Sequence, residues 1–387
     1  MGSDIFEILV NFAKMVAVFL LMVQLVPMLV WVERRGSAYI QNRFGPNRVG
    51  PLGLTQLLAD AVKFLFKEEF VPGKAYRAIF LTAPVIALIP AALAFACIPL
   101  STPVQVDAFE MMGRSWGPYT FLFQGFEMGI GIVFILGVSS LGAYALLMAG
   151  WGSSSKYSLF GALRACAQMI SYELALGLAL VGILLIYNTF SFSDMIAQQA
   201  GPLSFSFLGD KVVVPFLPNW GIFYQPLGAI LYFCAVFAET NRLPFDLPEA
   251  EGELVAGYHT EYGGIKMNMF YIGEYGHMMV ASALMAIFYF GGYHLPGLSP
   301  EGVNQFFASN GFSATIASLL TALVYFAILF AKILFFLWVF VWVRWTLPRL
   351  RYDQLMDLGW KTMLPWALAN TILTAIVVYV MRTHWGA

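Results

Sequence analysis

The sequence is poor in charge, and this shortage excludes most soluble classes of protein. Only 11% of its 387 residues are Asp, Glu, Lys or Arg, whereas soluble domains average about 25%. The basic residues form no stripe of the kind that binds nucleic acid, and the formal net charge is -1. Because 60% of the residues are hydrophobic and the mean hydropathy is +0.74, we predict an integral membrane protein that contacts lipid and no nucleic acid.

Cysteine and histidine are also scarce, which argues against a metal or redox centre on this chain. Cys97, Cys166 and Cys234 lie far apart, each inside an apolar segment, and no CxxC pair occurs. The four histidines are scattered, and neither a P-loop nor a GxGxxG fingerprint is present. We therefore expect no flavin, iron–sulfur cluster or metal on this chain, so other subunits must carry any redox or ATP-driven chemistry.

Long apolar segments are what the sequence has in abundance. Eight of them approach or exceed the roughly 20 residues that a membrane-crossing helix needs. The sequence therefore predicts an all-α membrane protein, with a single domain over residues 1–387 that holds eight transmembrane helices and one amphipathic interfacial helix. The predicted spans are 5–32, 79–100, 125–149, 159–186, 221–238, 271–293, 314–343 and 362–381.

Most of the 21 Lys and Arg residues fall in alternate loops, and this bias predicts the orientation. Cytoplasmic loops carry an excess of Lys and Arg, so loops 33–77, 150–158, 239–270 and 344–361 should face the cytoplasm or the mitochondrial matrix. An even number of spans then places both termini on the periplasmic or intermembrane-space side. The opposite loops are nearly uncharged and rich in Gly, Pro and Ser, and we interpret them as packing or partner surfaces.

The first of these loops contains a segment that is too short to span a membrane. Between residues 52 and 66 the apolar residues recur at the spacing of one helical face, while Asp60 and Lys63 belong to a polar stripe. We predict an amphipathic helix at the membrane interface, with Asp60 and Lys63 facing a polar compartment or a partner. An intrahelical ion pair between these two residues is the alternative.

Charged residues also mark the end of the first span, where Glu33, Arg34 and Arg35 follow one another. Arginines at this boundary are ordinary anchors of membrane orientation. A carboxylate beside two guanidiniums is less ordinary, since it stays ionised or joins a fixed network.

An acidic stretch at residues 239–264 holds six of the 22 carboxylates and one cation, Arg242. A helix beginning at Pro248 would explain Glu249 and Glu251 as charges that complement its dipole, but six acids are too many for that role. Carboxylates held close together raise one another's pKa, so we interpret the stretch as a proton-exchanging site. A solvated acidic docking face is the alternative.

Two ionisable residues lie deep inside predicted spans, where charge is costly and usually functional. Glu173 is roughly 20 Å and Lys332 roughly 18 Å from the same membrane surface, at 1.5 Å of rise per residue. Matching depth predicts a pair between them, direct or through water. The pair either lines an ion route or serves as a structural buried ion pair.

Four long stretches of the sequence resemble one known family, and they follow one another in the order expected for it. They are VERRGSAYIQNRFGPNRVGPLGLTQLLADAVKFLFKE, GWGSSSKYSLFGALRACAQMISYE, ETNRLPFDLPEAEGELVAGYHTEYGGIKMNMFYIGEY and LPRLRYDQLMDLGWK. This pattern resembles the H subunit family of respiratory complex I, the proton-pumping NADH:quinone oxidoreductase, whose mitochondrial counterpart is NADH dehydrogenase subunit 1.

The resemblance implies a subunit that forms the membrane side of the quinone chamber, with quinone, expected to be ubiquinone, as the substrate. It implies partners among the quinone-reducing subunits of the peripheral arm and the small and antiporter-like membrane subunits. The expected location is a bacterial cell membrane, in preference to a mitochondrial inner membrane.

The resemblance and the charges inside the spans together give two groups of candidate site residues, none of them catalytic or metal-binding. The quinone-binding candidates are Glu33, Arg34, Arg35, Asp60, Lys63, Phe64 and Arg242. The proton-coupling candidates are Glu173, Glu239, Asp246, Glu249, Glu251, Glu253, Glu261 and Lys332. Two alternative functions remain at this point: a membrane subunit of a related energy-converting hydrogenase, and a stand-alone proton-coupled transporter.

Overall fold

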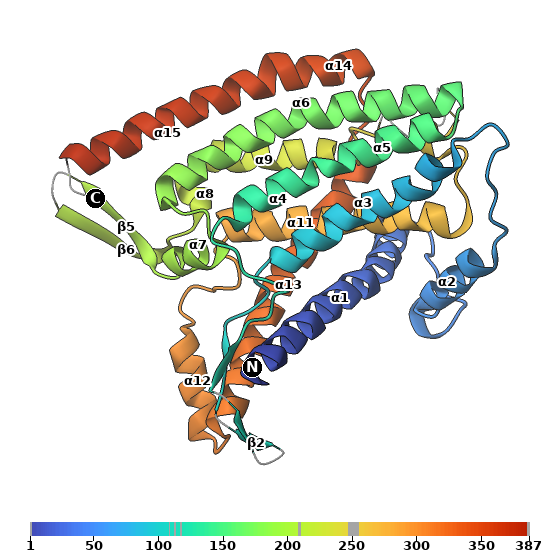
Figure 1. Ribbon diagram of the computed structural model, residues 1–387. Coiled ribbons are helices and arrows are strands. Elements are labelled where there is room, and N and C mark those ends of the chain that lie inside the picture. Colours follow the sequence, from blue (N-terminus) through green and yellow to red (C-terminus); the bar gives the residue numbers. More distant parts are fainter. Residues whose placement is uncertain are drawn as a thin grey trace.

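The computed structural model describes residues 2–107, 109–111, 114–116, 118–207, 210–246 and 255–384. Over these residues the chain folds into a bundle of long helices with three small two-stranded sheets at its periphery. Both termini lie at the end of the bundle opposite α2 (Gln56–Phe66) and α14 (Tyr352–Asp357) (Figure 1). The predicted helical bundle is thus confirmed.

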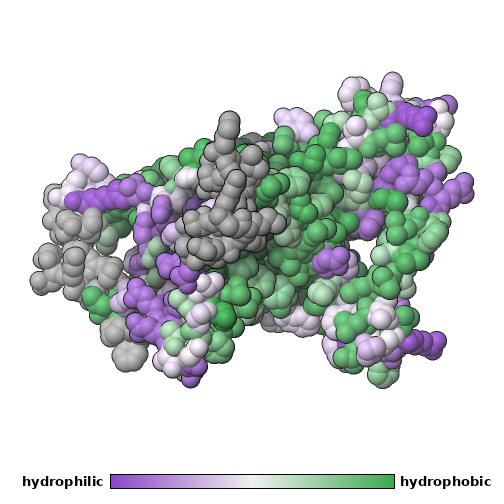
Figure 2. Space-filling view, turned by 60° about the horizontal axis from the view of Figure 1, so that its bottom comes forward, coloured by the Kyte–Doolittle hydropathy of each residue, from purple (hydrophilic) through white to green (hydrophobic). Residues whose placement is uncertain are grey.

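Six helical segments in the described part of the chain are long and apolar enough to cross a membrane. They are formed by α1 (Gly2–Ile40), α3 (Arg77–Cys97), α4 (Gly131–Ser139) with α5 (Leu141–Gly152), α6 (Lys156–Tyr187), α13 (Ala314–Thr346), and α14 continued through a π-helical turn (Leu358–Met363) into α15 (Leu364–His384). Each coincides with one predicted span. The surface shows the same amphiphilic layout, with hydrophobic side chains across the middle of one face and hydrophilic ones gathered toward its two ends (Figure 2).

The two remaining predicted spans, 221–238 and 271–293, contain helices of a different kind. α11 (Gly264–Tyr289) has 26 residues but carries charged and polar side chains along its length. The continuous helix predicted over 221–238 is wrong, because the chain breaks at Gln225 between α8 (Gly221–Tyr224) and α9 (Pro226–Glu239). With 14 residues, α9 is only about 21 Å long, shorter than the roughly 30 Å of a bilayer's hydrocarbon core.

The break at Gln225 is tolerated because the side chain is buried against α15. Asn370 Nδ2 donates a hydrogen bond to Gln225 Oε1 over 2.7 Å, and Gln225 Nε2 donates to the hydroxyl of Thr374. Irregular backbone at membrane depth is stable only where neighbouring protein supplies such partners.

Small residues bring the helices close together in the interior. A Cβ atom added to Gly273 of α11 would lie 2.8 Å from the carbonyl oxygen of Ala87 in α3. Gly36 of α1 packs as tightly against Trp338 of α13, where a Cβ would lie 2.6 Å from Cζ3. Close approach at small residues is the usual basis of helix packing in membranes, where apolar surface alone gives helices no reason to associate.

The loops predicted to face outward contain short sheets that the sequence did not predict. β1 (Val104–Val106) pairs with β4 (Tyr119–Phe121), β2 (Phe109–Met111) with β3 (Arg114–Trp116), and β5 (Pro202–Phe207) with β6 (Asp210–Pro218), all antiparallel. Two short helices, α7 (Phe192–Gln199) and α12 (Pro300–Ser309), accompany them. The β5–β6 hairpin projects from the bundle near the C-terminal end of α15 (Figure 1).

The predicted amphipathic helix is confirmed as α2, which begins at Gln56 after a 3₁₀ turn (Pro51–Gly53). None of its residues is buried. It lies beyond the end of α1 (Figure 1) and contacts both α1 and α11. A second 3₁₀ turn (Gly257–His259) comes shortly before α11 in the chain.

Candidate quinone and proton-coupling site

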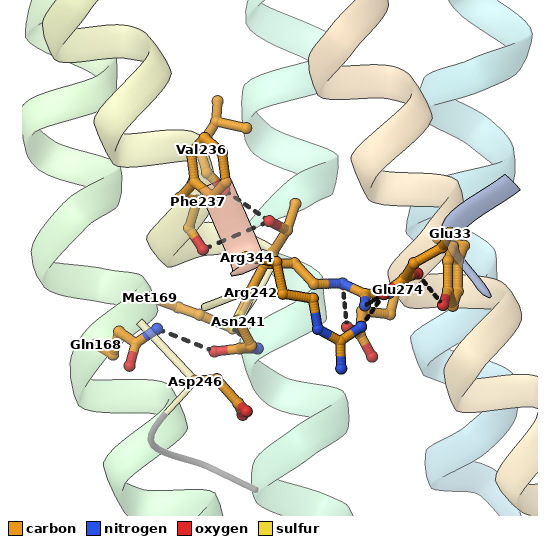
Figure 3. A network of polar contacts seen from close by, with 12 residues as sticks. Glu33, Gln168, Met169, Val236, Phe237, Asn241, Arg242, Asp246, Glu274 and Arg344 are labelled. Carbon is orange, nitrogen blue, oxygen red and sulfur yellow. Dashed lines mark hydrogen bonds and ion pairs between the residues drawn. The ribbon is translucent and has the colours of Figure 1, made fainter. Parts of the chain in front are cut away.

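A buried network of charged side chains joins α1, α11, α13 and the turn after α9 (Figure 3). Its centre is Glu33, which is only 6% exposed and whose carboxylate forms ion pairs with Arg344 and, over 3.4 Å, with Arg242. The hydroxyl of Tyr275 donates a hydrogen bond to the same carboxylate. Arg242 in turn pairs with Glu274 over 2.9 Å, and its guanidinium lies 4.3 Å from the ring centre of Tyr275.

Two carboxylates and two guanidiniums thus balance one another; Glu33, Arg242 and Glu274 are largely buried, and the side chain of Arg344 is 35% exposed. Removing one partner from a buried pair leaves an uncompensated charge, which typically costs about 3–5 kcal/mol. The sequence predicted that Glu33, beside Arg34 and Arg35, either stays ionised or joins a fixed network, and the structure shows it in a network. Its partners, Arg242 and Arg344, come from distant segments.

Three residues of the network, Glu274, Tyr275 and Arg344, were not predicted as site residues from the sequence. Glu274 and Tyr275 stand side by side within an apolar segment, and that placement was the available signal. The sequence indicated Arg344 only as one of the loop cations that orient the chain in the membrane.

Arg34 and Arg35 instead connect α1 to the segment that contains α2. Arg34 Nη1 lies 2.6 Å from Asp60 Oδ2, and Arg35 Nη1 donates to the carbonyl oxygen of Leu52 over 2.8 Å. Asp60 therefore pairs across helices, and the alternative of an Asp60–Lys63 ion pair is wrong. Lys63 is exposed and Phe64 is half-buried on α2.

A second acidic site lies deeper in the bundle, where Glu173 of α6 and Glu239 at the end of α9 are close enough for their charges to interact. The hydroxyl of Ser140 donates a hydrogen bond to Glu173, and Ser139 lines the same small cavity as Glu239. Both serines stand at the junction between α4 and α5. The structure therefore brings together these two predicted proton-coupling residues.

The predicted pair between Glu173 and Lys332 is wrong. The ammonium of Lys332 donates three hydrogen bonds of 2.7 Å, to the carbonyl oxygens of Phe290, Gly292 and His294. These bonds use all three donors of the ammonium, and they place a positive charge at the carboxyl end of α11, where the helix dipole favours it. A proton-coupling role for Lys332 stays a prediction.

Only two of the five acids predicted in the loop after Glu239 lie among the described residues. Asp246 pairs with Arg349 over 2.7 Å, and Glu261 lies half-buried in the turn that precedes α11. Glu249, Glu251 and Glu253 lie outside the described residues, as does the helix start predicted at Pro248.

An apolar cavity of about 230 Å³ lies between α1 and α13. Its lining is hydrophobic throughout and includes Leu25, Val32 and Leu337, together with Trp31 and Leu54 near α2. Val32, the residue directly before Glu33, is the last residue of α1 that lines the cavity. There the Glu33–Arg344 ion pair closes the gap between α1 and α13.

Comparison with known proteins identifies the family of this chain. A profile of the NADH dehydrogenase family matches residues 13–375. The H subunit of the NADH-quinone oxidoreductase of Bdellovibrio bacteriovorus is 66% identical over 380 residues, which cover 98% of this chain and 99% of that relative. This chain belongs to the NADH dehydrogenase family, among the H subunits of NADH-quinone oxidoreductase. The H 1 subunit of Cytophaga hutchinsonii (40% over 362 residues, 94% of each chain) and subunit 8 of Rhodothermus marinus (44% over 351 residues, 90% of this chain and 92% of the relative) agree.

Membership in this family confirms the resemblance seen in the sequence. The chain is a multi-pass membrane subunit of NADH-quinone oxidoreductase, a multi-subunit complex, and these relatives are bacterial. The two alternatives, an energy-converting hydrogenase subunit and a stand-alone transporter, are therefore set aside.

Proposed function

We propose that this subunit forms the membrane side of the quinone-binding chamber and couples quinone reduction to proton translocation. The supporting observations are the apolar cavity between α1 and α13, which Val32 lines, and the ion pair that Glu33, the next residue, forms with Arg344 of α13. A quinone carries a long hydrocarbon tail and a polar head. A hydrocarbon-lined space leading to a few fixed polar groups suits such an amphiphile.

The proposed access route runs from the bilayer past α2. Trp31 of α1 and Leu54, just before α2, both line the cavity, and the Arg34–Asp60 ion pair holds α2 to α1 at this point. Lys63 and Phe64 are proposed to contact the quinone as it passes. Ubiquinone is the proposed substrate.

The proposed coupling begins when electrons from neighbouring subunits reduce the quinone head and change the charge beside Glu33. Arg242 lies between Glu33 and Glu274, so a change on one carboxylate alters the field at the other. Glu239 precedes Arg242 by three residues and interacts with Glu173, which extends this sequence of charges into the bundle. Asp246 and the four loop acids Glu249, Glu251, Glu253 and Glu261 are proposed to face the quinone-reducing subunits.

The proposed topology has eight crossings, with both termini on the periplasmic side. The six long apolar segments supply six of them, and α11 and the shorter α9 supply the other two. The polar side chains of α11 and the break before α9 then lie inside protein and away from lipid. The position of both termini at the same end of the bundle agrees with an even count (Figure 1).

A tryptophan placed in the cavity tests the proposal. Leu25 lines the cavity, whereas Leu20 of the same helix is 52% exposed and does not line it. We expect Leu25→Trp in the assembled complex to raise the KM for a long-tailed quinone several-fold, with little change for NADH oxidation by an artificial acceptor at the peripheral arm. Leu20→Trp is the matched control. An unchanged KM in Leu25→Trp would exclude this cavity from the quinone route.

A further inference from the structure

A second, much smaller cavity lies between α4, α6, α9 and α11 and has a volume of about 20 Å³. Most of its lining is apolar, but five polar side chains reach it: Ser139, Tyr232, Glu239, Thr240 and His277. A cavity of this kind holds one water molecule when it offers about 10–15 Å³ and two to four polar partners. This site meets both conditions.

His277 lines this cavity and has no role in the proposed coupling described above. Its Nε2 atom is shielded from solvent and has no hydrogen-bond partner among the described residues. A buried polar atom left unpaired costs about 1–3 kcal/mol, and a water in the cavity would provide the missing partner. Gly142 of α5 is the facing residue, and even an added Cβ there would stay 3.7 Å from Nε2, so no side chain of that residue crowds the imidazole.

The other hydroxyl groups of the lining already have acceptors. Tyr232 donates to the carbonyl oxygen of Ala281 over 3.3 Å, and Thr240 donates to that of Val236 over 2.9 Å. The groups able to exchange a proton through the cavity are therefore Glu239, which interacts with Glu173, and the imidazole of His277.

His277 also occupies the right place between the two charged sites. It follows Glu274 by three residues on α11, and residues at this spacing lie on neighbouring positions of one helical face. Glu274 belongs to the network of Glu33 and Arg242, whereas Glu239 lines the same small cavity as His277. The imidazole thus stands where the network around Glu33 meets the acidic pair of Glu173 and Glu239.

We propose that His277 is a proton-relay residue, connected to Glu239 by one water molecule. In the step, the carboxyl group of Glu239 gives a proton to the water, and the water gives one of its own to Nε2. The products are a carboxylate and an imidazolium, only O–H and N–H bonds change, and the reverse transfer restores the starting state. Imidazole suits this role because one ring nitrogen can accept a proton while the other carries one to donate.

This inference rests on the proposed proton-coupling function and adds a residue to it. The test compares two variants. His277→Gln keeps a hydrogen-bonding side chain but removes the titratable group, whereas Leu284→Met changes the lining of the same cavity and leaves its titratable groups in place. Proton translocation driven by NADH and quinone is measured in membrane vesicles that hold the assembled complex. NADH oxidation by an artificial acceptor reports that the complex is intact.

We expect His277→Gln to slow proton translocation by about a hundredfold, the lower end of the range attributed to a positioned proton-transfer group, and Leu284→Met to leave it unchanged. His277→Asn, a smaller substitution with the same chemistry, provides a second variant if the first assembles poorly. Wild-type proton translocation in an intact complex with either variant would overturn the assignment.

A Glu239→Gln variant separates this inference from the function on which it rests. If Glu239→Gln blocks proton translocation and the His277 variants do not, the relay role of His277 is overturned and the proposed coupling function is supported. If neither position affects proton translocation, both are overturned.

Discussion

At the residue scale, Lys332 is a buried cation whose hydrogen-bond partners are main-chain carbonyls. We expect Lys332→Met to leave the carbonyl oxygens of Phe290, Gly292 and His294 without these donors, at a cost of about 1–3 kcal/mol for each buried group that stays unpaired. The thermal denaturation midpoint of the purified complex should fall. Lys332→Arg, which keeps the charge and several donors, should recover part of the loss.

The same variant also decides between two roles for this residue. A lower midpoint with normal proton translocation per NADH would indicate a structural cation. An unchanged midpoint with impaired translocation would contradict that view and support the proton-coupling role predicted from the sequence.

His294, in the loop after α11, gives the chain a pH-dependent stability. Burial, together with the nearby charge of Lys332, lowers the pKa of His294 to about 4 from its ordinary value of 6.5. The unfolded chain therefore binds this proton more readily than the folded chain, and the free energy of unfolding falls as the pH drops from about 6.5 toward 4. Above about pH 7 the effect is absent, because the imidazole is neutral in both states.

Denaturation midpoints of the complex measured between about pH 8 and about pH 4.5 test this linkage. His294→Gln should show a shallower loss of stability on the acid side than the natural chain. Parallel curves for the two proteins would show that another group controls the acid response.

The residue scale is also where sequence reasoning had least information. It placed Glu33 in a fixed network because of the neighbouring arginines, yet Arg242 and Arg344 form that network. Spacing along one helix identifies which residues share its face, but it does not show which face of a distant helix packs there. The same limit explains the mistaken pairing of Glu173 with Lys332, which matched in depth but lie against different neighbours.

At the scale of elements, α2 lies against α1 and α11 with none of its residues buried, and the Arg34–Asp60 ion pair connects it to α1. We expect Asp60→Ala to remove the ion pair with Arg34 and to increase the rate of proteolytic cleavage around α2 in the intact complex. Global stability should change by less than about 1 kcal/mol, because exposed ion pairs contribute little. Lys63→Ala, on the exposed side of the same helix, is the control and should be cleaved at the natural rate.

Elements with local signals were predictable, and elements fixed by distant partners were not. The amphipathic pattern of α2 is complete within its own residues, so the sequence was sufficient. The break at Gln225 had a local signal in Pro226, which begins α9, but the contacts of the Gln225 side chain with Asn370 and Thr374 of α15 had none. The small sheets of the outer loops were missed because alternating strands are hard to distinguish in a chain that is apolar nearly everywhere.

At the scale of the whole molecule, the acidic pair in the bundle should matter for energy coupling. We expect Glu173→Gln to reduce proton translocation by about a hundredfold, the lower end of the loss attributed to a positioned proton-transfer group, while NADH oxidation by an artificial acceptor continues. Glu301→Gln, in the peripheral helix α12, is the matched control. Normal translocation in Glu173→Gln would contradict the proposed coupling through this site.

The membrane class and the family could both be recognised from the sequence, for different physical reasons. The class followed from composition, because a chain with so few charges cannot cover itself with a polar surface. The family followed from four long motifs, whose order no single short pattern could supply. The cavity between α1 and α13 was beyond the sequence, because its lining comes from several helices whose packing only the structure gives.

The charged network also constrains how the chain is made. Glu33 leaves the ribosome early with the first span, whereas its tightest partner, Arg344, is encoded near the other end of the chain. Throughout most of synthesis this carboxylate must stay hydrated or protonated at the membrane boundary. The ion pair that joins α1 to α13 can therefore form only after α13 has been synthesised.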